Sequence, residues 1–124
     1  MKVAVTAQGA DLEAMASPVF GRCPVFVLVD TESMQVEAIA NPSISAGGGA
    51  GIQAAQAIID KGAQAVLSQN VGPNAFAVLD AAGVAVYRFD GGTVRQAVEA
   101  FIAGKLPQIG YANASPHSGM GRSF

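Results

Sequence analysis

A glycine-rich segment in the middle of the chain is the first candidate for binding chemistry. Directly before a predicted helix the sequence places four glycines in five residues: Gly47, Gly48, Gly49 and Gly51. At a helix N-terminus, backbone N–H groups without crowding side chains can bind phosphate or another anion. The same glycines could instead serve only a tight turn and close packing of the helix on a sheet. Because no Lys-Ser or Lys-Thr pair follows, the segment is not a Walker A loop.

Arg22 and Cys23 form a second candidate site in an earlier loop. The Arg22 guanidinium could neutralise an anionic ligand, and a Cys23 thiolate would be a soft metal ligand. The alternatives are a solvated arginine and a small, half-buried cysteine beside the turn at Pro24. Cys23 is the only cysteine, which excludes an intramolecular disulfide and any metal site built from several cysteines of one chain.

Two further polar residues could contribute to a site, Asn74 and His117. Asn74 could donate a hydrogen bond to a ligand, or simply occupy the first turn of a helix that Pro73 opens. His117 is the only histidine and could bind a metal, although a lone histidine in a segment rich in glycine and serine is more often solvated. Nucleophilic catalysis needs a positioned base, and the first predicted strand carries no carboxylate for a metal-dependent nuclease. We therefore expect binding without catalysis.

Composition and charge restrict the classes of partner. The chain of 124 residues has the size of one domain, with seven Lys and Arg residues against nine Asp and Glu residues. A net charge of −2 disfavours a nucleic-acid surface. Hydrophobic residues make up 51% of the chain, but no run of them is long enough to span a bilayer, and the N-terminus lacks the apolar core of a secretory signal. We expect a cytoplasmic protein without nucleic-acid or membrane partners.

Apolar patterns along the chain predict an α/β fold. Five strands are expected, at residues 2–7, 25–30, 35–40, 63–67 and 84–88. A helix follows each of the last three strands, and Thr93 with Gln96 forms a capping box for the third helix. A short polar turn makes the second and third strands a hairpin. Right-handed crossovers then predict a mixed sheet in the order 3-2-1-4-5, with the second strand antiparallel and helices on both faces.

This topology brings the candidate residues to one edge of the sheet. Four loops meet beyond the carboxyl ends of the parallel strands: residues 8–24, 41–49, 69–73 and 90–92. Ligands of open α/β sheets bind at this edge. Residues 1–105 are expected to form the folded domain, and residues 106–124, which show no apolar periodicity, are expected to form a flexible tail.

Four short motifs in these loops occur in the order typical of a known family. They are Val19-Phe20-Gly21-Arg22-Cys23-Pro24, Asn41-Pro42, Gly47-Gly48-Gly49-Ala50-Gly51 and Gly72-Pro73-Asn74-Ala75-Phe76. Together they resemble the dinitrogenase iron–molybdenum cofactor biosynthesis domain family. The resemblance implies a ribonuclease H-like fold and a carrier, without activity of its own, for an iron–sulfur or iron–molybdenum type cofactor or its precursor. It also implies proteins that donate and accept this metallocofactor, in nitrogen fixation or another pathway.

The single cysteine departs from the pattern of a permanent cluster site. Iron–sulfur clusters are usually held by several thiolates, and Cys23 is alone. A cluster would therefore be bound transiently or between subunits, and the oligomeric state stays open. Two alternatives to the carrier remain. One is a regulatory module that binds phosphate or a nucleotide on the glycine-rich segment, and the other is an interaction domain without a ligand.

Overall fold

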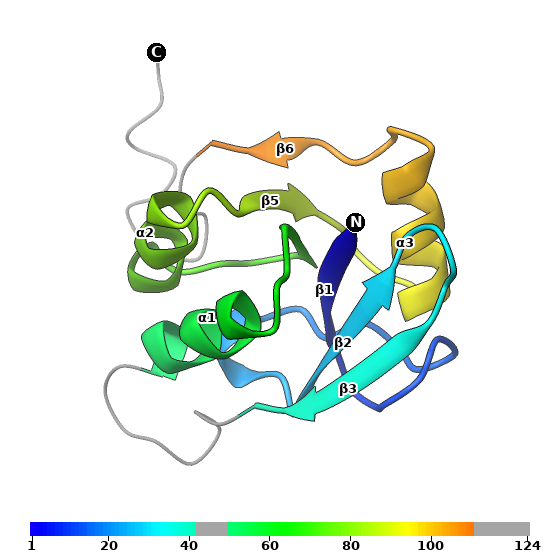
Figure 1. Cartoon of the computed structure of the whole chain (residues 1–124), viewed down its shortest axis with the longest axis horizontal. Helices are drawn as coiled ribbons and strands as arrows, with labels where there is room; N and C mark the ends of the chain where they lie inside the picture. Colours follow the sequence, from blue (N-terminus) through cyan, green and yellow to red (C-terminus); the bar gives the residue numbers. More distant parts are fainter. Residues whose placement is uncertain (42–49, 111–124) are drawn as a thin grey trace.

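Strand β1 (Lys2–Ala7) is an interior strand of a mixed sheet, between β2 (Val25–Asp30) and β4 (Ala65–Ser68) (Figure 1). The structure is a computed structural model and describes residues 1–41 and 50–110. β1 pairs antiparallel with β2 and parallel with β4. Side chains of β1 alternate between two apolar cores, one on each face of the sheet. Burial on both faces explains why apolar residues occupy nearly every position of this strand.

The strand order follows the predicted topology for the first five strands. β3 (Val36–Ala40) pairs antiparallel with β2, and β5 (Ala85–Arg88) pairs parallel with β4. The complete order is β3-β2-β1-β4-β5-β6. The predicted order and the antiparallel direction of the second strand are therefore confirmed, while the ribonuclease H-like name stays a prediction.

The predicted number of five strands is wrong, because a sixth strand completes the sheet. β6 (Gln108–Ile109) pairs antiparallel with β5, and the N–H of Arg88 donates to the carbonyl oxygen of Pro107 at 2.9 Å. Without these contacts β5 would be an unpaired edge. β6 belongs to the segment predicted as a flexible tail, in which Leu106 also packs against one core. The rest of that segment, residues 111–124, lies outside the described residues.

Helices cover both faces of the sheet, as predicted. α1 (Ala50–Asp60) and α2 (Pro73–Ala81) pack on one face, and α3 (Val94–Ile102) packs on the other (Figure 1). The capping box of α3 is confirmed. The Thr93 hydroxyl accepts from the N–H of Gln96 at 3.1 Å, and the Gln96 side chain accepts from the N–H of Thr93 at 2.9 Å. These bonds satisfy two donors that a helix N-terminus otherwise leaves unpaired.

The carboxyl ends of β1, β3, β4 and β5 lie at the same edge of the sheet, because β2 and β6 run the other way. Asp30 ends β2 at the far edge, opposite Lys2. The sheet therefore collects the predicted loops at one edge. In the part of the chain that the structure describes, no helix is both long and apolar enough to cross a membrane.

Truncating the C-terminus at two points measures what β6 contributes. A chain that ends after Lys105 loses Leu106 and the β6 pairing, whereas a chain that ends after Gly110 keeps both. We expect the shorter chain to be less stable by about 1–3 kcal/mol, the scale of one buried aliphatic side chain with its neighbouring hydrogen bonds. Urea unfolding followed by circular dichroism gives both free energies of unfolding. Equal values would contradict a structural role for β6.

Candidate functional site

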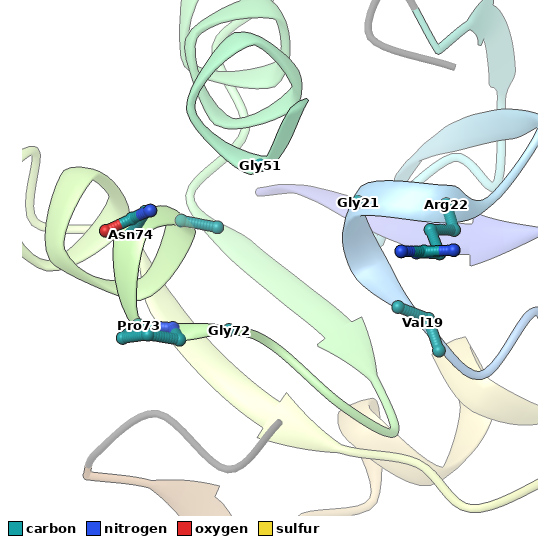
Figure 2. Close-up of a pocket in the computed structure, with 8 residues that line it drawn as sticks. Val19, Gly21, Arg22, Gly51, Gly72, Pro73 and Asn74 are labelled. Atoms are coloured by element: carbon teal, nitrogen blue, oxygen red, sulfur yellow. The ribbon is translucent and has the colours of Figure 1, made fainter. Parts of the chain in front are cut away.

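A pocket of about 290 Å³ lies at the carboxyl edge of the sheet. Its walls are a short 3-10 helix, η1 (Phe20–Arg22), and the N-termini of α1 and α2 (Figure 2). The lining residues are Val19, Gly21, Arg22, Gly51, Gly72, Pro73, Asn74 and Ala75. Three residues predicted for the site, Arg22, Gly51 and Asn74, therefore share one pocket although they lie on three separate elements.

The N-terminus of α2 directs backbone donors toward the pocket. α2 begins with Pro73, and its N-cap residue, Gly72, makes no side-chain capping hydrogen bond to the helix. The N–H of Phe76 donates to the carbonyl oxygen of Gly72 at 2.9 Å, which starts the hydrogen-bond ladder of the helix. The N–H groups of Asn74 and Ala75 precede this ladder, so they have no acceptor within their own helix. Donors of this kind, together with the helix dipole, attract anions.

Gly51 allows the N-termini of α1 and α2 to approach each other closely. A Cβ atom at this position would lie 3.1 Å from the Cβ of Ala75, closer than most real contacts of this kind. A Cβ at Gly21 would lie 3.6 Å from the Cα of Gly51, so η1 is also close. Gly51 therefore serves close packing, and this packing brings two helix N-termini to one pocket.

Backbone and aromatic contacts anchor η1 beside the loop before α2. The ring of Phe20 is fully buried, and its centroid lies 5.0 Å from that of Phe26 on β2. The N–H of Phe20 donates to the carbonyl oxygen of Asn70 at 3.0 Å, and the N–H of Asn70 donates to the carbonyl oxygen of Pro18 at 2.9 Å. These contacts hold one wall of the pocket against the other.

Arg22 provides the charge of the pocket. Its side chain is exposed, and Figure 2 shows it across the pocket from Asn74. Among the described residues that line the pocket, it is the single charged one, and none is acidic. The positive guanidinium and two positive helix ends therefore face the same space, which suits an anion.

Cys23 follows η1 directly but is fully buried and does not line the pocket. Its thiol lies 3.4 Å from the carbonyl oxygen of Phe20, to which it donates, and burial raises its pKa to about 12. A metal ligand would need the thiolate, which this environment disfavours at neutral pH. Within residues 1–41 and 50–110, no three His, Cys, Asp or Glu side chains gather to hold a metal ion. Cys23 packs the loop here, and its metal binding stays a prediction.

The structure also gives a supporting role to Asn41, which the sequence placed in a family motif but not among the candidate site residues. Asn41, at the end of β3, is buried and its side chain binds main-chain atoms of the η1 loop. The signal in the sequence was weak, because its partners lie 18 and 20 positions earlier. The remaining predicted site residues lie outside the described part of the chain: Gly47, Gly48, Gly49 and His117.

Comparison with known proteins supplies a family context. The sequence profile of the dinitrogenase iron–molybdenum cofactor family matches residues 1–104. An uncharacterised protein of Methanocaldococcus jannaschii is 32% identical over 96 residues, and the match covers 75% of this chain and 81% of that protein. The apo form of the orange protein from Desulfovibrio gigas is 43% identical with a TM-score of 0.87, covering 90% of this chain and 95% of that chain. A NifB-like protein from Thermotoga is 44% identical with a TM-score of 0.77, covering 86% and 91%, respectively.

The buried thiol of Cys23 predicts how stability depends on pH. Its pKa is raised from 9.0 to about 12 in the folded chain, so above about pH 9 the unfolded chain loses a proton that the folded chain keeps. The contribution of this thiol to stability is complete below that pH. It then falls by up to about 1.4 kcal/mol per pH unit as the pH rises toward the folded pKa.

Urea unfolding of the wild type and of Cys23→Ala between about pH 8 and pH 11 isolates this contribution, because other titrating groups act equally in both chains. We expect the stability advantage of the wild type to shrink steadily above about pH 9. An advantage that stays constant over this range would mean that the Cys23 thiol ionises as freely in the folded chain as in the unfolded one.

Proposed function

Because the chain belongs to the dinitrogenase iron–molybdenum cofactor family, we propose that its pocket binds an anionic metal–sulfur cofactor, or the precursor of one, for transfer between proteins. The protein is then a carrier with no catalytic step of its own. The cargo, as we call the bound species, lies between Arg22 and the N-termini of α1 and α2. Donor and acceptor proteins exchange it at the open mouth of the pocket.

The observation that carries this proposal is the convergence of two helix N-termini and Arg22 on a pocket whose described lining residues include no acidic side chain. Each helix end contributes about 0.3–1 kcal/mol toward binding a negative charge, and a charge-assisted hydrogen bond contributes about 1.5–3 kcal/mol. These contributions sum to about 2–5 kcal/mol, and further hydrogen bonds from backbone N–H groups to the cargo must add to them to give moderate affinity. Moderate affinity suits a carrier, because the cargo must also leave.

The donor groups of the pocket fit an assembled cluster better than bare metal ions. Metal ions of iron–sulfur sites usually take thiolate ligands, and the described lining residues offer none. The metal ions of the cargo must therefore bring their own sulfide ligands. Backbone N–H groups and the Arg22 guanidinium then hydrogen-bond to the outer sulfur or oxygen atoms. A pocket of about 290 Å³ is at the small end of ligand sites, so the cargo is compact.

A phosphate-binding module would use the same donors and is the second candidate. The described lining residues include no aromatic side chain on which a nucleotide base could stack. This composition favours a compact anion over a nucleotide. Competition between phosphate and a metal–sulfur species therefore separates the two functions.

Anaerobic incubation with iron, sulfide and molybdate, followed by desalting, tests the proposal directly. We expect the wild type to retain a coloured species, seen by visible absorbance with metal analysis. Arg22→Ala should retain it with about tenfold lower affinity, the effect of losing one charge-assisted hydrogen bond of about 1.5 kcal/mol. Lys105→Ala is the matched control, because this substitution also removes one positive charge. Lys105 is exposed and follows α3, on the face of the sheet opposite to α1 and α2.

Two results would contradict the metal–sulfur proposal. Equal losses in Arg22→Ala and Lys105→Ala would exclude the pocket and leave only the net charge of the chain as the cause. No retained metal in the wild type, together with saturable phosphate binding that Arg22→Ala weakens, would assign the pocket to phosphate instead.

A further inference from the structure

Asn41 binds the carbonyl groups of the two residues on either side of Arg22, Gly21 and Cys23. Its side-chain Nδ2 donates to the carbonyl oxygen of Cys23 at 2.8 Å and to that of Gly21 at 3.2 Å. Its own N–H donates to the carbonyl oxygen of Pro24 at 3.0 Å, so main chain and side chain bind the same loop. The residue is 2% exposed, which keeps water from replacing these bonds.

The carbonyl groups of the η1 loop need such a partner. η1 is a single turn, and the carbonyl groups at the C-terminal end of a helix receive no hydrogen bond from N–H groups of that helix. One amide group at position 41 satisfies two of these carbonyls at once. A change of backbone conformation at Arg22 would therefore disturb these hydrogen bonds, and losing the buried bond to Cys23 would be costly.

We propose that Asn41 is a positioning residue for anion binding, which acts by holding the Arg22 guanidinium at the mouth of the pocket. This inference rests on the proposed function, because it assigns to Asn41 a role in the affinity of that same pocket. The physical reason is preorganisation. A long arginine side chain on a fixed backbone loses less freedom on binding than one on a mobile loop, so the bound anion gains affinity.

A merely structural role for Asn41 would give a different pattern, and a double-mutant cycle separates the two. If Asn41 acts through Arg22, its substitution should lower affinity when Arg22 is present and change little when Arg22 is absent. If Asn41 only stabilises the fold, its substitution should have the same effect in both backgrounds.

The cycle uses the full chain, with sulfate as the probe because it is a compact dianion without redox chemistry. The backbone amide signals of Asn74 and Ala75 in NMR titrations report binding at the pocket. Asn41→Leu removes both donated bonds without adding charge. Asn41→Ser, which is smaller and keeps one donor, serves if the leucine variant fails to fold. Val98→Ala is the matched control, since Val98 is fully buried on α3, in the core on the opposite face of the sheet from Phe20 of η1.

We expect Asn41→Leu to weaken sulfate binding about tenfold in the wild type and less than about twofold in Arg22→Ala. Val98→Ala should lower the unfolding temperature without changing sulfate affinity. Equal losses from Asn41→Leu in both backgrounds, or no loss in either, would overturn the positioning role while leaving the anion site intact. If sulfate does not saturate the Asn74 and Ala75 signals of the wild type, the anion site itself fails, and with it the role of Asn41.

Discussion

Two helices begin in contact with each other over the end of the sheet, and the pocket depends on that contact. It exists because residue 51 is a glycine, where a Cβ would lie 3.1 Å from the Cβ of Ala75. The contact brings two positive helix ends together, and Arg22 adds a full charge beside them. Like charges at short range repel each other, so this arrangement costs free energy until an anion neutralises it. The packing of the fold and the preference of the pocket for negative charge therefore have the same origin.

The loop that carries Arg22 shows how the fold separates structural groups from binding groups. Phe20 and the Cys23 thiol are buried in the core, and buried Asn41 binds carbonyl groups of the loop, while the Arg22 side chain is exposed at the pocket. A rigid loop with one outward cation is suited to presenting charge without covalent chemistry. Such a site can bind and release a preassembled anion, since no protein–metal bond has to form or break.

Much of the sheet could be predicted from the sequence, because strands buried on both faces leave continuous apolar runs. The runs at residues 2–7 and 25–30 match β1 and β2 without adjustment. β6 was missed because two residues show no periodicity, and its pairing is set by the free edge of β5. The location of the pocket followed from the direction of the parallel strands. The burial of Cys23 and the bonds of Asn41 did not, since both depend on how η1 turns, which no local pattern reveals.

The position of the metal in a loaded crystal tests the central claim most directly. Crystals of the protein prepared anaerobically with the metal–sulfur species can be measured at the iron absorption edge, where anomalous scattering locates the metal. The account predicts metal density inside the pocket, with sulfur or oxygen atoms of the cargo within hydrogen-bonding distance of the Asn74 amide and the Arg22 guanidinium, and with Cys23 still buried. Density outside the pocket, or a metal bonded directly to the Sγ of Cys23 after the loop has opened, would contradict it.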